Sequence, residues 1–197
     1  MMRQFYPGLI FLILLLAAGC NSKFHYRIDG KFAEGQYDGE QIYLVPMVGA
    51  TPDNVDSCTI LGGAFHFEGK ADSAQIYILR TRIALRVKIQ ETIVAKEEGK
   101  AWVALGDRSF VGGTPTNDSI QAWKVQKEKL DEEIYNLQIA KRQLTGPEGE
   151  RATERLDSLI TATRAFHLAT AKRNEENTFG ELLKNMLGEK AVAQDGF

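Results

Sequence analysis

The sequence has few of the residues on which enzymes most often depend. It contains only three histidines in 197 residues. These histidines, His25, His66 and His167, are far apart, and no two have the short spacing of a metal-binding motif such as H-x-x-x-H. We therefore predict no metal site and no cofactor.

Cysteine is as scarce, with only Cys20 and Cys58 present. If Cys20 is modified as argued below, Cys58 is the single thiol, so neither an intrachain disulfide nor a C-x-x-C redox pair can form. Cys58 lies in a β-favouring run, residues 57–60, with no Lys, Arg or His within several residues to activate it. We interpret Cys58 as a small buried apolar side chain.

An excess of positive charge is also missing. The 24 Lys and Arg residues stand against 26 Asp and Glu residues, which gives a formal net charge of −2. No cluster of basic residues is interleaved with aromatic ones, as proteins that bind nucleic acid usually require. We therefore do not expect the protein to bind nucleic acid.

No apolar run is long enough to cross a membrane as a helix. The longest run covers residues 9–18, whereas a transmembrane helix needs about 20 apolar residues. It follows Arg3 and a break at Pro7-Gly8, and it ends in Ala17-Ala18-Gly19-Cys20. A basic start, a short apolar segment and small residues at the end are typical of a secretory signal peptide.

The sequence Ala17-Ala18-Gly19-Cys20 resembles a lipobox, the motif read by the bacterial lipoprotein maturation machinery. This resemblance implies that residues 1–19 are a signal peptide and that the Cys20 thiol takes a diacylglyceryl group carrying palmitate-like chains. Residues 20–23 then form the lipidated N-terminus and a short linker. Two or more acyl chains anchor a protein stably, so we expect the chain in the cell envelope, on the periplasmic or surface side of a bacterial membrane.

Residues 24–113 are predicted to form an antiparallel β sandwich or barrel-like domain. Turn signals recur at short intervals, as at Asp29-Gly30, Gly62-Gly63 and Gly106-Asp107, and short β-favouring runs lie between them. His66 alternates with Phe65 and Phe67 and should point away from the core. We expect the aromatic residues of this region to be core residues, namely Phe24, Tyr26, Phe32, Tyr43, Phe65, Phe67 and Tyr77. A further strand is expected over Leu85, Val87 and Ile89.

Residues 114–188 are predicted to be helical, which makes the fold class α+β. Pro115 marks the boundary, and Asn117 or Asp118 is the expected cap of the first long helix. Its apolar face carries Ile120, Trp123, Leu130, Ile134, Leu137 and Leu144. Gly146-Pro147 interrupts the pattern. A second helix then carries Leu156, Leu159, Ile160, Phe166 and Ala169 on one face, so the two helices should form an antiparallel hairpin.

Thr178-Phe179-Gly180-Glu181 has the form of a capping box for a short third helix that Gly188 should end. Its apolar stripe consists of Phe179, Leu182, Leu183, Met186 and Leu187. A helix of this length does not persist on propensity alone, so we expect it to dock. We favour docking onto the hairpin formed by residues 118–173, and the alternative is an interaction surface for a second copy or another envelope protein. Residues 189–197 are expected to form a frayed tail.

No catalytic constellation emerges from the remaining candidates. Asp56, Ser57 and His66 have the residue types of a hydrolase catalytic triad. The sequence has no G-x-S-x-G motif, however, which would hold the serine in a strained, exposed turn. We interpret Asp56-Ser57 as turn chemistry at the start of a strand. We therefore predict no catalytic residues.

The β region resembles the domain of unknown function that precedes a TlpA-like thioredoxin domain in lipid-anchored thiol-disulfide oxidoreductases. The residues that carry this resemblance are Tyr26–Gly30, Gly39–Leu44, Asp56-Ser57, Gly63–Gly69, Ile76-Tyr77 and Gly113–Asp118. The resemblance implies a fold and a setting in the envelope. It implies no reaction, because the Trp-Cys-x-x-Cys of the thioredoxin domain has no counterpart among these residues.

The sequence thus predicts a non-catalytic binding or scaffolding module anchored by Cys20. The alternative is an accessory component of envelope thiol-disulfide chemistry, which would bind a client or a full-length oxidoreductase. Two observations would separate these functions: the identity of the protein it associates with, and the response of that association to redox state.

Overall fold

The computed structural model describes residues 23–32, 37–81 and 91–188. The expected strand at 85–89, the tail 189–197 and Cys20 lie outside these residues. Within the described residues, eight strands precede the helices: β1 (Phe24–Phe32), β2 (Gln41–Pro46), β3 (Asp56–Thr59), β4 (Ala64–Ala71), β5 (Gln75–Thr81), β6 (Glu91–Lys96), β7 (Gly99–Leu105) and β8 (Phe110–Gly112). Three helices follow: α2 (Pro115–Lys141), α3 (Gly146–Arg173) and α4 (Thr178–Leu187).

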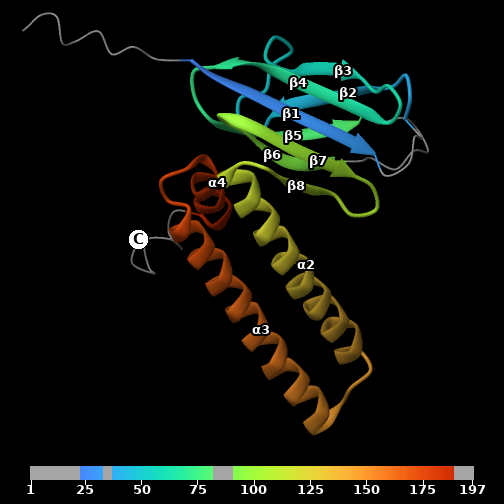
Figure 1. Cartoon of the computed structure of the whole chain (residues 1–197). Helices are drawn as coiled ribbons and strands as arrows, with labels where there is room; N and C mark the ends of the chain where they lie inside the picture. Colours follow the sequence, from blue (N-terminus) through green and yellow to red (C-terminus); the bar gives the residue numbers. More distant parts are fainter. Residues whose placement is uncertain (1–22, 33–36, 82–90, 189–197) are drawn as a thin grey trace, which may run out of the picture.

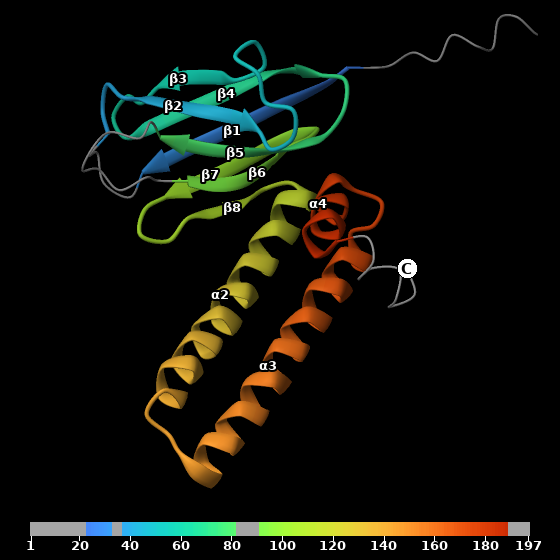
Figure 2. The same ribbon diagram turned by 180° about the vertical axis from the view of Figure 1, so that it is seen from behind.

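The strands form two four-stranded sheets that lie face to face, with orders β4-β1-β7-β8 and β3-β2-β5-β6 (Figures 1 and 2). The predicted α+β class and β sandwich are confirmed. All pairings but one are antiparallel, as expected, and the exception is the parallel pair of β1 and β7. This pair arises because the first strand of the domain inserts between β4 and β7 and not at a sheet edge.

Alternating side chains build the core between the sheets. In β4, Phe65 and Phe67 are buried and His66 is exposed, as their alternation predicts. Five of the seven aromatic residues expected in the core are buried: Tyr26, Phe32, Phe65, Phe67 and Tyr77. The Phe65 ring lies over Gly30, its partner on β1, where a Cβ atom would come within 2.1 Å of ring carbons.

The ends of the hairpin helices nearest the sheets share the core of the sandwich. One continuous core cluster contains residues of the strands and of all three helices. Its helical members are Ile120 and Trp123 of α2, Ala171 of α3, and Phe179 and Leu183 of α4. Farther along, the two long helices contact only each other, and their far turn extends well away from the sheets (Figure 1). None of the described helices combines the length and the hydrophobicity that crossing a membrane requires.

Three details of the helices differ from the sequence predictions. The residue before α2 is Thr114, so Asn117 and Asp118 lie inside the first turn, where they do not serve as the cap residue. The Asn117 side chain binds Ala95 of β6, and the Asp118 carboxylate accepts from Gly113 N. The cap of α4 is Asn177, whose side chain accepts hydrogen bonds from Phe179 N and Gly180 N, and Thr178 is the first helical residue. Gly188 ends this helix with a φ of 81°, as predicted.

The third difference is the buried face of α3. Ile160 is 47% exposed and Ala169 is also exposed, although both were assigned to the buried face. Because α3 meets only α2 over most of its length, its contact stripe is narrower than the face of a helix packed in a globular core. The residues of α3 that are buried are Ala152, Leu156, Leu168, Thr170 and Ala171.

Candidate functional site

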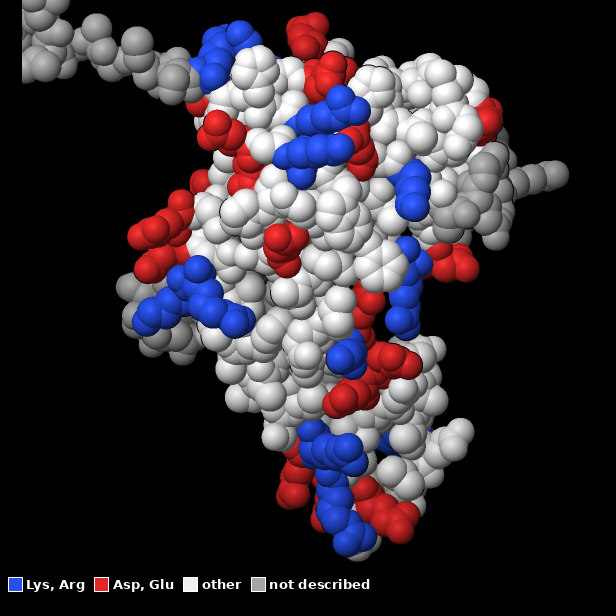
Figure 3. Space-filling view, in the orientation of Figure 1, with Lys and Arg blue, Asp and Glu red and all other residues white. Residues whose placement is uncertain are grey.

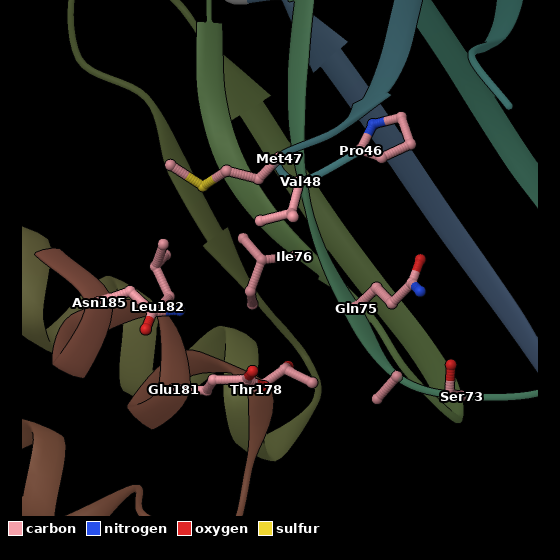
Figure 4. Close-up of a pocket in the computed structure, with 11 residues that line it drawn as sticks. Pro46, Met47, Val48, Ser73, Gln75, Ile76, Thr178, Glu181, Leu182 and Asn185 are labelled. Carbon is pink, nitrogen blue, oxygen red and sulfur yellow. The ribbon is translucent and has the colours of Figure 1, made fainter. Parts of the chain in front are cut away.

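A cleft of about 360 Å³ lies where α4 meets one end of the sandwich. One wall is the loop after β2 together with the turn from β4 into β5, and the other is one face of α4 (Figure 4). The residues that line it are Pro46, Met47, Val48, Ser73, Ala74, Gln75, Ile76, Thr178, Glu181, Leu182 and Asn185.

The sheet-side wall is fixed by backbone hydrogen bonds. Met47 N donates to Ile76 O at 3.0 Å, which ties the loop to the start of strand β5. Beyond it, the Asn54 side chain accepts from Thr51 N at 2.7 Å and donates to Gly49 O at 2.9 Å, so the loop folds back on itself. This loop presents Val48 to solvent with 82% of its surface exposed.

The helix-side wall follows from the amphipathic pattern of α4. Phe179 and Leu183 are 0% and 1% exposed in the core, so the side chains on the opposite flank line the cleft. The helix sits close to the end of α3 because residue 180 is glycine. A Cβ atom there would lie 2.0 Å from the carbonyl oxygen of Asn174.

The chemistry of the cleft suits binding. Its lining combines aliphatic side chains with neutral hydroxyl and amide groups, and Glu181 is the single ionisable residue among them. The Thr178 hydroxyl is buried with no hydrogen-bond partner among the described residues. A site of this size and composition can hold a small uncharged or amphiphilic group, and no lining residue pairs a nucleophile with a base.

The predicted apolar stripe of α4 is divided between the core and the surface. Phe179 and Leu183 are buried, Leu182 and Leu187 are partly buried against the core, and Met186 is 59% exposed. The helix therefore docks within the chain, on the end of the hairpin and on β5. Only Leu182 of this stripe reaches the cleft, so the stripe as a whole is not a free surface.

The side chains of Asp56, Ser57 and His66 form no hydrogen-bonded triad among the described residues, although β3 and β4 contact each other. Ser57 pairs with Tyr43 in one sheet and His66 pairs with Asp29 in the other. No described hydrogen bond joins Ser57 to His66, and the Asp56 carboxylate instead accepts from Ser57 N at 2.8 Å. Asp56 and Ser57 are the first two residues of β3, so they lie at the start of a strand, as predicted.

Cys58 packs against the core from edge strand β3 with intermediate exposure. The pKa of the Cys58 thiol is raised, mainly by burial. The negative charge of Asp56 also raises this pKa, whereas a backbone hydrogen bond from His66 lowers it. A raised pKa leaves little thiolate at neutral pH, and thiolate is the reactive form. Cys58 thus packs against the core as an apolar side chain, as interpreted, but it is partly and not fully buried.

Two polar side chains of the hairpin, Lys124 of α2 and His167 of α3, are partly buried. Lys124 Nζ donates to Thr92 Oγ1, Ser109 O and Ser109 Oγ, each at 2.8–2.9 Å, and burial lowers the pKa of this amine. Trp123 Nε1 donates to His167 Nδ1 at 2.9 Å. That ring nitrogen must therefore carry no proton, and burial together with the Lys127 charge lowers the pKa of His167.

Charges of both signs are mixed over the outer face of the β4-β1-β7-β8 sheet (Figure 3). Asp29 binds Arg27 at 2.8 Å and Lys100 at 3.0 Å, and Arg27 also reaches Glu68 at 3.2 Å. Partial burial alone would raise the pKa of Asp29, but hydrogen bonds from Lys100 and Arg27 lower it. Because these four side chains pair charges of opposite sign, this part of the sheet surface offers no broad area of one charge to a charged ligand.

Metal binding finds no support in the described part of the chain, where no three His, Cys, Asp or Glu side chains gather as a metal ion would require. Sequence reasoning missed the cleft itself. Its one visible signal was Met47-Val48, an apolar pair in a turn just after Pro46, where the chain was expected to be polar.

Residues 26–120 match the model of a family described as a domain of unknown function (DUF4369). The match begins in β1, includes all later strands and ends in the first turns of α2. It supports the predicted resemblance as far as that domain, whereas the link to thioredoxin-like proteins stays a prediction. No curated protein and no solved structure matches the chain.

Proposed function

We propose that this chain is a lipid-anchored, non-catalytic binding module of the cell envelope, which is held to its membrane by Cys20 and takes an uncharged or amphiphilic ligand in the cleft beside α4. The observation that carries the binding role is the composition of the cleft. Of the residues that the structure describes, aliphatic side chains and neutral polar groups line it, with one carboxylate and no activated nucleophile.

The anchor rests on the lipobox-like Ala17-Ala18-Gly19-Cys20 after the apolar run. Mass spectrometry of the N-terminal peptide from membranes should show a peptide that begins at Cys20 with added acyl mass. Cys20→Ala should leave the longer precursor, because no thiol remains to accept the diacylglyceryl group. A wild-type protein recovered from the periplasm without acyl mass would contradict the anchor.

The binding role is tested by photo-crosslinking in intact cells. A benzophenone amino acid at Gln75, inside the cleft, should give an adduct of one defined mass, whereas the same probe at Gln143, exposed in the α2–α3 turn, should not. Equal labelling at both positions would mean that the cleft is not the binding site. An adduct with an oxidoreductase that changes with redox state would support the accessory redox role.

A further inference from the structure

We propose that the end of the sandwich that bears the cleft faces the membrane and that the cleft holds an acyl chain of a membrane lipid. This inference rests on the proposed anchor at Cys20 and goes beyond it by naming the ligand. Three observations carry it: where the chain enters the fold, where the exposed apolar residues lie, and which charges are missing from the cleft.

The first observation is the place at which the chain enters the sandwich. Phe24, the first residue of β1, pairs with Ala71, the last residue of β4. Lys23 reaches Asp72 at 3.4 Å, and Ser73 next to it already lines the cleft. Both ribbon views place the start of β1, the β4–β5 turn and α4 at the same end of the sandwich (Figures 1 and 2).

The covalent chain limits the distance to the anchor. Cys20 precedes Phe24 by four residues in the sequence. A fully extended chain spans about 3.3–3.6 Å per residue, so the Cα atoms of these two residues can be no more than about 14 Å apart. The headgroup region on each side of a bilayer is itself about 5–8 Å thick. A lipidated Cys20 therefore brings this end of the sandwich to the bilayer surface.

The second observation is the apolar rim that this end presents. Val48 is 82% exposed and Met47 is 36% exposed, on a loop that its own hydrogen bonds hold in place. Across the cleft, Leu182 of α4 extends toward this loop (Figure 4). Exposed apolar side chains gathered around a cleft are a feature of membrane and ligand contacts.

The third observation is electrostatic. Among the described residues, no Lys or Arg lines the cleft and Glu181 is the one charged residue, so this lining would repel the phosphate of a lipid headgroup. The neutral groups of Ser73 and Gln75 can instead donate hydrogen bonds to ester carbonyl oxygens at the top of an acyl chain. The lining thus fits the ester and upper acyl region of a lipid.

The test uses the full lipidated protein in vesicles of phosphatidylethanolamine with a minor fraction of phosphatidylglycerol. In a Cys58→Ala background, a fluorophore is attached through Val48→Cys, or at the opposite end of the sandwich through Leu61→Cys. Leu61 is a matched control because it is apolar and 71% exposed, and it lies before the start of β4. Lipids brominated along their acyl chains should quench the fluorophore at position 48 and leave the one at position 61 bright.

Occupancy of the cleft is tested in the same vesicles with a lipid that carries a photoreactive acyl chain. It should label the peptide that contains Gln75, and Asn185→Trp, which fills the cleft from α4, should abolish this label. Met186→Trp, an exposed change on the same helix outside the cleft, should preserve it. Circular dichroism verifies that both variants are folded.

Equal quenching at positions 48 and 61 in protein with confirmed acyl mass would overturn the inference and leave the anchor intact. Crosslinks from position 75 to a second copy, with no lipid label, would also overturn it by assigning the cleft to self-association. A protein without acyl mass would overturn both the anchor and this inference.

Discussion

Asn117 shows how one side chain can complete a sheet edge. It is fully buried at the start of α2, and β6 is an edge strand. Its amide accepts from Ala95 N at 2.8 Å and donates to Ala95 O at 2.9 Å and to Thr114 Oγ1 at 2.8 Å. The side chain thus satisfies the outward-facing backbone groups of Ala95, as a neighbouring strand would.

We expect Asn117→Asp to lower the free energy of unfolding by about 1–3 kcal/mol. A carboxylate oxygen would then face Ala95 O, where the amide nitrogen now donates a hydrogen bond. Denaturant unfolding measures this change. Asn136→Asp, the same substitution at an exposed position of α2, is the control and should change stability by less than about 0.5 kcal/mol. Equal effects at both positions would contradict the role of Asn117.

His167 should make stability depend on pH near neutrality. Its folded-state pKa is lowered by burial and by Lys127, with Asp131 opposing, and an unfolded histidine titrates near about 6.5. Between these two values the unfolded chain binds the proton more readily, so the free energy of unfolding falls as pH drops below about 6.5. Protonation of Nδ1 also removes the hydrogen bond from Trp123.

The measurement is the midpoint of thermal unfolding as the pH is lowered from neutral. The wild-type midpoint should fall more steeply than that of His167→Gln, whose side-chain oxygen can accept the same bond from Trp123 at any pH in the range. Parallel curves for the two proteins would show that His167 does not contribute.

At the scale of elements, helix α4 packs on the end of the hairpin and on β5, and it forms one wall of the cleft. Phe179 meets Trp123 edge to face, with ring centroids 5.6 Å apart, and Leu183 is buried beside it. Gly180 allows α4 to approach the end of α3 closely. The amphipathic pattern predicted the helix and its need to dock, but it could not show that Phe179 and Leu183 face inward while Met186 stays in water. That division depends on where α3 ends and where β5 begins.

Leu183→Ala should lower the free energy of unfolding by about 2–5 kcal/mol, the usual cost of emptying a buried leucine site. Met186→Ala, three residues farther along α4 at a 59% exposed site, should change this free energy by no more than about 0.5 kcal/mol. Chemical denaturation compares the two variants. Similar losses in both would indicate that the stripe of α4 is buried as a whole.

At the scale of the molecule, the sequence predicted the class of fold well because its signals are local. Alternation in β4 and helical spacing in α2 depend on neighbours in the chain. The pairing of β1 with β7 and the bonding of Asn117 to Ala95 join residues far apart in sequence, and no local pattern records them. The cleft likewise exists only because three separate segments converge.

The sequence alone predicts that a protease should cut first at the junction of residues 112–118 or at residues 146–149. The structure makes the junction the poorer target, because Gly113 N binds Asp118 Oδ1 at 2.9 Å and Thr116 binds Glu97 through two hydrogen bonds. Residues 142 and 143, by contrast, are exposed in the α2–α3 turn.

We therefore expect a broad-specificity protease to cut the α2–α3 turn before the junction, because an exposed turn opens more readily than a hydrogen-bonded one. Mass spectrometry of the first fragments measures the order. Fragments that end within residues 112–118 at the earliest times would show that the helical region separates from the sheets more easily than its contacts imply.

The central place of β1 also sets the order in which the chain can fold. β1 is synthesised first among the strands, yet it lies between β4 and β7 and pairs with β7 in parallel. Contacts between residues so distant in sequence raise the contact order, which slows folding. The sheet cannot be completed until β7 is available, so the strand nearest the proposed anchor has to remain unpaired on one edge while most of the domain is still being made. A nascent chain of this protein should therefore depend on protection of that edge until residues 99–105 have emerged.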